Sequence, residues 1–338
     1  MPRVLLLFGG RSAEHEVSCT SAVAVHEALT SAAHQVIPVG ISRDGVWHMA
    51  DAGRSPFQAV GRPVTWEVPG GHLTAGADEI GFDVVFPVLH GPYGEDGTMQ
   101  GLFEITGVPY VGCGVLASAL AMDKDTAKRL FAAAGLPVAR WEVVSADAFD
   151  TGPAAVVSGL VERLQLPAFV KPNALGSSVG VTKVTTEAEL KEGIEIALAY
   201  GPRAIVEEAV RGREIEVGVL EGPRVSVPGE IVLEVEWYDY DAKYRDDTSR
   251  FVAPALLRQS QVAEVQALAA RAFEVLGCRS MARVDFFLEE GARGFLLNEV
   301  NTIPGFTPIS GFPKMWQASG MAYADLCDEL VNIALGTT

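Results

Sequence analysis

The first 41 residues alternate between apolar runs and a helical pattern, and this order restricts the possible folds more than any other part of the chain. Residues 3–8 and 36–41 are apolar runs. Between them, apolar and small residues recur at the spacing of one helix face over 17–29. A strand–helix–strand order predicts two parallel strands with the helix packed against them, so we expect an α/β protein.

The rest of the chain predicts further strands and helices. A buried strand is expected at 83–89 and a helix over 98–105, whereas residues 50–81 are rich in Gly and Pro and are expected to be mostly irregular. A change in composition at 119–126 marks a domain boundary, and a small α+β unit is predicted beyond it. Its strands are expected at 168–171, 180–184 and 204–207, its helices at 124–134 and 187–200, and later helices at 262–276 and 321–335.

Composition excludes several classes of protein. The chain has 49% hydrophobic and 20% charged residues, which is ordinary for a globular protein, and its apolar runs are too short to cross a bilayer. The run at 4–8 is also too short for a signal peptide, so we expect a cytoplasmic protein whose four cysteines are reduced. A net charge of −17 argues against nucleic acids and membranes as partners. A polyphosphate ligand would need a divalent cation and placed lysines to reverse this field locally.

A predicted hairpin near the C-terminus gives the strongest indication of chemistry. Two apolar runs within 281–297 flank a turn, and Arg283, Asp285, Glu299 and Asn301 lie at their far ends. Residues two apart on a strand share a face, so Arg283 accompanies Asp285 and Glu299 accompanies Asn301. Two carboxylates and an amide are hard oxygen donors that suit Mg²⁺ bound to phosphates. A surface salt bridge of Arg283 with the acids is the alternative, but it leaves Asn301 and the following Pro-Gly turn unexplained.

A glycine-rich segment, 176–180 (GSSVG), lies between two strand patterns. Its small residues let backbone N–H groups approach an anion, and its two hydroxyls add donors. The segment lacks the spacing of a Walker A loop, so phosphate binding and an ordinary turn both stay open. Lys171 precedes it at the end of an apolar strand, where a lysine either meets an anion or extends its ammonium to solvent.

Residues 112–117 (GCGVLA) match a dinucleotide-binding pattern but lack its acidic residue. That pattern requires a carboxylate about twenty residues further on, at the end of the next strand. The chain has GLPV at 135–138, so an NAD-dependent dehydrogenase is excluded. A glycine turn before a helix of small residues is expected instead.

Two other segments allow both a functional and a structural interpretation. The aromatic and charged segment 237–250 has no clear periodicity and is expected to be an ordered loop. It either closes over an active site or packs its aromatics in a core with a solvated rim. Glu14 lies at the expected start of the first helix. It either compensates the helix dipole, which its position alone favours, or points into the crevice at the ends of parallel strands.

Several motifs occur in a fixed order across nearly the whole chain. They are LFGGRSAEHEVS (7–18), LHGPYGEDGTMQG (89–101), AMDK (121–124), VKPNALGSSVGV (170–181), YDYDAKY (238–244), ARVDFF (282–287) and NEVNTIPGFTPIS (298–310). Together they resemble the D-alanine–D-alanine ligase family of ATP-grasp enzymes. The resemblance implies a cytoplasmic homodimer that joins two D-alanine molecules, with ATP as co-substrate, for peptidoglycan precursor synthesis.

The resemblance also implies a three-domain ATP-grasp fold. We expect an N-terminal parallel α/β domain at 1–120, a small central α+β lid domain at 121–209 and a C-terminal α+β domain at 210–338. ATP would lie between the sheets of the second and third domains. The loop at about 237–250 would close over the site.

Nucleotide-binding roles follow from the resemblance. Lys124 and Lys171 would contact the phosphates of ATP, and Ser177 and Ser178 would lie in the loop that covers them. The nucleoside would be held by Glu207, Val210, Glu214, Phe287 and Asn298. Two Mg²⁺ or Mn²⁺ ions would be held by Asp285, Glu299 and Asn301, and a monovalent cation is a further candidate cofactor.

The resemblance implies a second set of residues for the amino acid substrates and the chemistry. Glu14 would bind the ammonium group of the first D-alanine, and Ser178 and Tyr244 would connect the covering loops to it. Arg283 and the Gly305 N–H would form the oxyanion site. Lys243 and Ser310 would hold the second D-alanine or the transferring phosphate, and His90 would complete the substrate site.

Two other functions are weighed against this one. A related ligase would join D-alanine to D-lactate or D-serine, but Tyr244 directly after Lys243 is typical of the members that form the dipeptide. A nucleotide-binding protein without catalysis would have lost acidic ligands or Arg283, and the chain keeps them. Departures from the family pattern are confined to residues 173–175 and Gly311. The departure at Gly311 is expected to affect the shape of the second substrate site.

Overall fold

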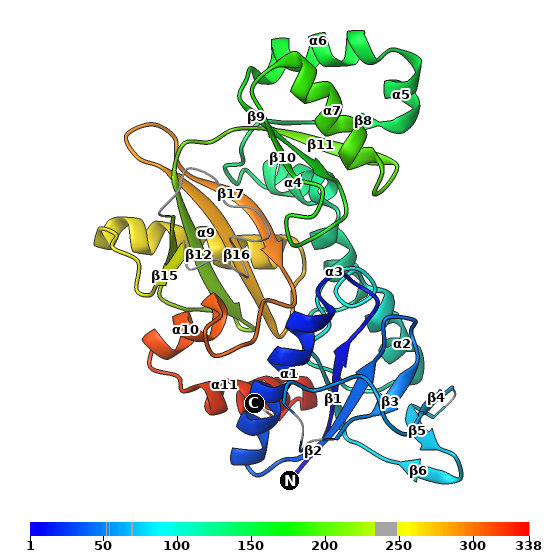
Figure 1. The fold of residues 1–338 in the computed structure, drawn as a ribbon. Helices are drawn as coiled ribbons and strands as arrows, with labels where there is room; N and C mark the ends of the chain where they lie inside the picture. The colour runs from blue at the N-terminus through cyan, green and yellow to red at the C-terminus, as the bar shows by residue number, and fades with distance from the viewer. Residues whose placement is uncertain (52, 54, 69, 234–248, 338) are drawn as a thin grey trace.

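The computed structural model describes residues 1–51, 53, 55–68, 70–233 and 249–337, and it confirms the α/β class. Its N-terminal sheet has the strand order β3-β2-β1-β7, with β1 parallel to both β2 and β7 (Figure 1). The predicted strand–helix–strand unit is confirmed. Its elements are β1 (Arg3–Gly9), α1 (His15–Ser31), β2 (Gln35–Ile41), β3 (Trp47–Met49) and β7 (Val84–Pro87).

Strand β1 is buried on both faces, which explains its continuous apolar run. Val4, Leu6 and Phe8 face a core that also contains residues of α1 and of the last helix, α11 (Tyr323–Leu335). Leu5 and Leu7 belong to a separate core that also holds side chains from β2, β5 (His72–Ala75) and the helix α2 (Thr98–Thr106). Successive side chains of the strand therefore enter two different cores.

Most of the described residues in 50–81 are irregular, as expected, but three short strands within this stretch were not predicted. A small antiparallel sheet in the order β4-β5-β6 forms there, and Leu73 and Ala75 of β5 belong to the same core as Leu5. Each strand has only three or four residues, which is too short for an alternating pattern to stand out among glycines. The strands are β4 (Thr65–Glu67), β5 (His72–Ala75) and β6 (Asp78–Ile80).

The central part of the chain is an antiparallel sheet in the order β10-β9-β11-β8, with helices on one face. Val170 of β9 and Val206 of β11 pack with the helices, so Lys171 and Glu207, one residue along each strand, lie on the opposite face. The predicted strands and helices are confirmed, whereas β8, α5 and α6 were not predicted. The elements are α4 (Lys124–Ala133), β8 (Trp141–Ser145), α5 (Ala146–Thr151), α6 (Pro153–Leu164), β9 (Ala168–Pro172), β10 (Thr182–Val184), α7 (Glu187–Leu198) and β11 (Arg203–Glu208).

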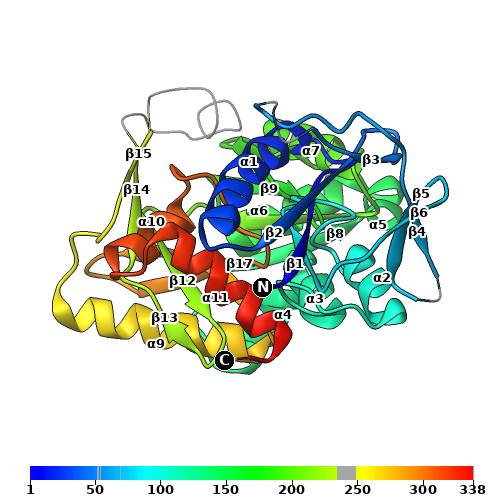
Figure 2. The same ribbon diagram turned by 90° about the horizontal axis from the view of Figure 1, so that it is seen from below.

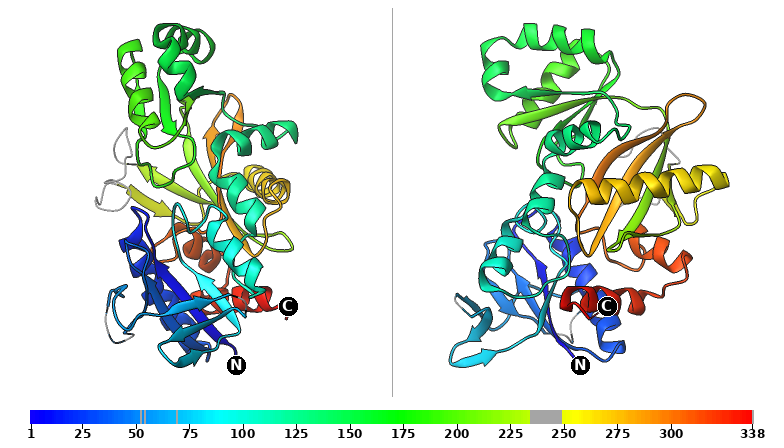
Figure 3. Two further views of the ribbon diagram at one scale, coloured as in Figure 1. Left: turned by 90° about the vertical axis from the view of Figure 1, so that its right-hand side faces the viewer. Right: turned by 180° about the vertical axis from the view of Figure 1, so that it is seen from behind.

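The largest sheet follows in the order β15-β14-β12-β16-β17, with β13 beside β12. The long helix α9 covers one face, where Val265 and Ala269 pack with Val217 and Val284 (Figure 3). The predicted hairpin is confirmed, but β17 is longer than expected and contains both Glu299 and Asn301. The elements are β12 (Arg213–Leu220), β13 (Arg224–Val225), β14 (Gly229–Leu233), β15 (Ser249–Val252), α9 (Gln259–Val275), β16 (Met281–Glu289) and β17 (Gly294–Asn301).

The helices at the C-terminal end return to the N-terminal sheet. The helix α10 (Gly311–Ala318) packs on β12, and α11 packs on α1 and β7 (Figure 2). The N-terminal and central parts lie at opposite ends of the molecule, with the largest sheet between them (Figures 1 and 3).

The helix of small residues predicted after the glycine turn is α3 (Val115–Met122). All four cysteines are free and buried. None of the helices in the described part of the chain has the length and apolarity needed to span a membrane.

Candidate active site

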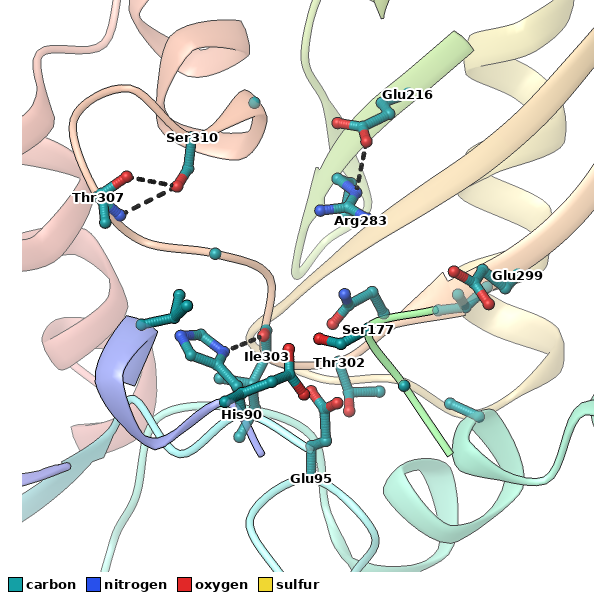
Figure 4. A pocket seen from close by; sticks show the side chains of 18 of the residues that line it. His90, Glu95, Ser177, Glu216, Arg283, Glu299, Thr302, Ile303, Thr307 and Ser310 are labelled. Carbon is teal, nitrogen blue, oxygen red and sulfur yellow. Dashed lines mark hydrogen bonds and ion pairs between the residues drawn. The ribbon is translucent and has the colours of Figure 1, made fainter. Parts of the chain in front are cut away.

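A cavity of about 630 Å³ lies where the N-terminal sheet, the glycine-rich segment and the largest sheet meet (Figure 4). It brings together residues from both ends of the chain. The predicted site residues that line it are Glu14, His90, Lys124, Ser177, Arg283, Glu299, Asn301, Gly305 and Ser310. Lys243, Tyr244 and most of the predicted closing loop lie outside the described residues.

Three neighbouring strands place acidic residues side by side. Glu216 of β12 lies opposite Asp285 of β16, and Asp285 lies opposite Glu299 of β17. Two residues before Asp285, Arg283 lies opposite Asn301. Side chains two apart on a strand share a face, so all of these residues lie on the face of the sheet that α9 leaves uncovered. Glu216 was not predicted from the sequence, because only the pairing of β12 with β16 places it beside Asp285.

Arg283 is a fixed, buried cation in the wall of the cavity. Its Nε and Nη2 donate bonds of 2.7 Å to Oδ1 and Oδ2 of Asp285, and its Nε lies 3.3 Å from Oε1 of Glu216. Burial disfavours the charge, but Asp285 and Glu216 outweigh burial and hold the pKa of Arg283 well above its usual value. The side chain is only 9% exposed, so the alternative of a surface salt bridge does not apply.

The donor set around Asn301 fits a divalent cation. Oδ1 of Asn301 is buried and has no hydrogen-bond partner among the described residues, which is rare for a carbonyl oxygen unless a ligand completes it. The pairing of β16 with β17 shifts between Asp285 and Phe286, and this bulge leaves Asn298 as the extra residue before Glu299. An orphaned oxygen on the sheet face that also carries Asp285 and Glu299 is the environment that hard cations prefer. In the described part of the chain, no three His, Cys, Asp or Glu side chains are spaced to hold a metal.

The floor of the cavity comes from the N-terminal part. Glu14 occupies the N-cap position of α1, but its carboxylate makes no capping hydrogen bond and lines the cavity instead. His90 Nδ1 donates a 3.0 Å bond to the carbonyl of Ile303, which ties the segment after β7 to the segment after β17 (Figure 4). Burial lowers the pKa of His90, so the imidazole is neutral at pH 7.

Glu95 also lines the cavity, and it was not predicted as a site residue although its motif was recognised. Oε1 accepts a bond of 3.1 Å from the Gly91 N–H, and Oε2 is buried with no hydrogen-bond partner in the part of the chain that the structure describes. Burial, and then the charge of Glu14, raise the pKa of Glu95 to about 8. A carboxylate in a glycine-rich turn gives no indication in the sequence of the direction in which it points.

Replacement of Glu95 by Gln is expected to remove part of the loss of stability that the protein shows as pH rises. A carboxyl group with a higher pKa in the folded state binds more protons when folded than when unfolded. The stability of the protein therefore falls as pH rises from 4.5, the ordinary pKa of a glutamate, to about 8. Gln keeps an oxygen for the Gly91 N–H but cannot ionise. In urea unfolding, we expect the variant to gain about 1–3 kcal/mol over the wild type between pH 5 and pH 8.

Asp96→Asn is the matched control for this measurement. Oxygens of Asp96 accept from the N–H groups of Tyr93 and Thr98 in the same turn, but Asp96 does not line the cavity. Its replacement should leave the pH dependence unchanged. A wild-type pH dependence in Glu95→Gln would show that this carboxyl titrates normally.

A second charged cluster lies between the central sheet and α4. Glu207 bridges two lysines, with Oε2 at 2.5 Å from Lys171 Nζ and Oε1 at 2.8 Å from Lys128 Nζ. Burial opposes ionisation of Glu207, but the two lysines outweigh it and hold its pKa well below the usual range. Lys171 therefore does not extend to solvent as the alternative supposed. Lys124, one turn before Lys128, donates a 2.7 Å bond to the Leu175 carbonyl and lies 3.8 Å from Oε2 of Glu299.

The other predicted nucleotide-site residues do not line the cavity. Glu214 lies opposite Phe287 on the same sheet face as Asp285, and Val210 lies in the link between β11 and β12. In the glycine-rich segment, Ser177 and Ser178 have φ of +53° and +56°, a region that residues with a side chain seldom adopt. The residues predicted for the nucleotide or its metals that lie outside the cavity lining are Lys171, Ser178, Glu207, Val210, Glu214, Asp285, Phe287 and Asn298.

Comparison with known proteins gives one consistent family. The chain matches the models described as D-ala D-ala ligase N-terminus over residues 3–113 and D-ala D-ala ligase C-terminus over residues 130–332. A D-alanine–D-alanine ligase from Streptomyces griseus is 45% identical and aligns with 99% of this chain and 93% of its own length.

Solved structures agree with this assignment. The D-alanine-D-alanine ligase from Coxiella burnetii has a TM-score of 0.87 at 34% identity, over 99% of this chain and 94% of its own. The VanG D-Ala:D-Ser ligase from Enterococcus faecalis has a TM-score of 0.86 at 35% identity, over 98% of this chain and 99% of its own. The relatives align over almost their full length and the family models cover most of the chain, so this protein belongs to the D-alanine–D-alanine ligase family.

Proposed function

We propose that this protein joins two molecules of D-alanine into D-alanyl-D-alanine, with ATP cleaved to ADP and phosphate, to supply a peptidoglycan precursor. The observation that carries the proposal is the convergence on one cavity of Glu14 from the N-terminal sheet with Arg283, Glu299 and Asn301 from the largest sheet. A carboxylate, a fixed cation and a set of oxygen donors are the groups that such a reaction needs. Their occurrence in a chain of this family makes the dipeptide the best-supported product.

The reaction requires activation of a poor electrophile. The carboxylate of the first D-alanine attacks the γ-phosphorus of ATP, which gives D-alanyl phosphate and ADP. The amine of the second D-alanine then attacks the carbonyl carbon, and the tetrahedral intermediate expels phosphate. Glu14 faces the ammonium of the first substrate, and Arg283 with the Gly305 N–H stabilises the negative charge on the carbonyl oxygen.

Phosphate binding is assigned to two lysines and to bound cations. Lys124 and Lys171 supply positive charge to the phosphates, and Ser177 and Ser178 belong to the segment that covers them. Asp285, Glu299 and Asn301 would hold two Mg²⁺ or Mn²⁺ ions, which would neutralise the charge of the transferred phosphoryl group. The orphaned oxygen of Asn301 supports this assignment.

The remaining roles stay predictions. His90 and Ser310 line the cavity and are proposed to contact substrate together with Lys243, and Tyr244 is proposed to connect the closing loop to Glu14. The nucleoside is assigned to Glu207, Val210, Glu214, Phe287 and Asn298. Domain boundaries after 120 and 209, a homodimer, residence in the cytoplasm and a monovalent cation also stay predictions.

A phosphate-release assay tests the proposed function. The protein is supplied with ATP and Mg²⁺, and with D-alanine, L-alanine or no amino acid. We expect strong phosphate release with D-alanine alone, because D-alanine is the substrate that gives the proposed dipeptide in a chain of this family. Equal release in all three reactions would refute the proposal.

A second experiment tests the choice of the second substrate. A mixture of D-alanine with D-lactate or D-serine, with products identified by mass, should give mainly the D-alanine dipeptide. A mainly mixed product would assign the chain to the ligases that join D-alanine to D-lactate or D-serine.

A further inference from the structure

We propose that Lys128 is a positioning residue for ATP, which neutralises Glu207 and so leaves the charge of Lys171 available to the phosphate groups. The inference rests on the proposed function, in which Lys171 contacts ATP. It adds a residue to the site that the motifs do not assign. It also gives the Glu207 carboxylate a second task, as the bridge between two ammonium groups.

The contacts of Glu207 are divided between the two lysines. One carboxylate oxygen lies 2.8 Å from Lys128 Nζ and the other lies 2.5 Å from Lys171 Nζ. The Lys128 side chain is 2% exposed, whereas that of Lys171 is 16% exposed. Lys128 is therefore sealed behind the carboxylate, and Lys171 is the member of the cluster that a ligand can reach.

Stability alone does not explain the second lysine. Glu207 and Lys171 would form a neutral pair without Lys128, and a buried ammonium is costly wherever an apolar side chain could fill the same space. The neighbouring buried positions of α4 show that this face of the helix does accept apolar residues, such as Ala127 and Phe131. A lysine at position 128 instead gives the cluster two positive charges and one negative charge.

The excess charge matters because acidic residues surround Lys171. Glu299 and Glu214 act on its ammonium in addition to Glu207, and the whole chain carries a net charge of −17. In a buried site such charges are weakly screened by salt. Without Lys128, Glu207 alone would balance Lys171, and an incoming triphosphate would meet no surplus positive charge there.

Five variants test the proposal in the full-length protein. Lys128→Met keeps an unbranched side chain of similar size and removes its charge. We expect the KM for ATP to rise about 10- to 100-fold, the usual effect of losing one charged contact in a desolvated site. The KM for D-alanine should change less than about threefold, because Glu14 and Arg283 are untouched. Lys128→Arg keeps the charge and should stay within a few-fold of the wild type. Lys191→Met, which removes an exposed lysine of α7 in the same part of the chain, controls for net charge.

The double variant Lys128→Met/Glu207→Gln, compared with Glu207→Gln, separates this role from a structural one. Glu207 is itself assigned to the nucleoside, and the loss of that contact is common to both of these proteins. In the Glu207→Gln background no carboxylate balances Lys171, so Lys128→Met should weaken ADP binding much less than it does in the wild-type background. A purely structural role for Lys128 predicts the same loss of affinity in both backgrounds. Calorimetric titration with ADP and Mg²⁺ measures these affinities even when turnover is low, and thermal unfolding verifies that each variant is folded.

Two outcomes would overturn the proposal. One is an unchanged KM for ATP in Lys128→Met, and the other is an effect of Lys128→Met on ADP binding that is equally large in the wild-type and Glu207→Gln backgrounds. If Lys128→Met does not fold, Lys128→Gln supplies the same comparison. Failure of the proposed function is recognised separately, because wild-type protein would then release no phosphate with D-alanine whatever its affinity for ADP.

Discussion

The Glu299→Gln variant is expected to lose at least about 10³-fold in kcat while it folds normally. Glu299 lies opposite Asp285 and lines the cavity beside Asn301, where two carboxylates and an amide are proposed to hold the cations. A metal ion contributes several kcal/mol to stabilisation of the transferred charge, and each 1.4 kcal/mol is a factor of ten in rate. Gln has the same shape, and the Glu299 side chain is 34% exposed, so the substitution leaves a normal fold.

The measurement is phosphate release as a function of Mg²⁺ concentration. We expect the variant to need far more Mg²⁺ than the wild type for its residual activity. Glu290→Gln is the matched control, because Glu290 lies in the turn between β16 and β17 of the same hairpin and its side chain is 58% exposed. A Glu299→Gln protein with nearly normal kcat at low Mg²⁺ would show that the metal assignment is wrong.

The Phe306→Ala variant is expected to lose about 3–5 kcal/mol of stability, the range for removal of a buried phenyl ring. Phe306 is fully buried in the segment between β17 and α10. Its ring lies 5.8 Å from the rings of Phe86 and Phe312 and 5.9 Å from that of Tyr323. These contacts hold the segment that contains Gly305 against the N-terminal sheet and α11, so the kcat should fall as well.

Two controls separate stability from activity in this case. Phe149→Ala removes a buried ring from the core of the central part, so it should cost a similar stability and leave kcat unchanged at low temperature. Tyr323→Phe removes only the hydroxyl that donates a 2.6 Å bond to the Phe306 carbonyl, which should cost about 1 kcal/mol. Urea unfolding and phosphate release are measured for all three variants. A stable Phe306→Ala protein with normal turnover would mean that this aromatic cluster does not position Gly305.

The elements that could be predicted from the sequence are those with a long or distinctive pattern. Strand β1 is buried on both faces, so its sequence is continuously apolar. The β16–β17 hairpin shows two apolar runs on either side of a turn. Spacing by two along a strand was enough to place Arg283 beside Asp285, and the structure shows both bonds. By contrast, β4, β5 and β6 escaped prediction because three or four residues are too few to establish a period.

The parts of the site that could not be predicted depend on contacts between distant segments. Lys128 looks like a solvated lysine on an amphipathic helix, and only the docking of α4 on the central sheet places it beside Glu207. Glu216 and Asp285 are neighbours solely through strand pairing. Glu14 shows a related limit, since helix position alone favoured compensation of the helix dipole, whereas its carboxylate lines the cavity. Pattern within one element finds candidate residues, but tertiary packing decides their partners.

The packing of α11 on α1 has a consequence for biosynthesis. About 290 residues separate the end of α1 at Ser31 from the start of α11 at Tyr323. A ribosome that adds roughly 5–20 residues per second would leave α1 without this cover for about 15–60 s. Throughout that interval Ala22, Val25 and Leu29 lack the helix that completes their core. The nascent chain therefore depends on protection from aggregation until its last helix has emerged.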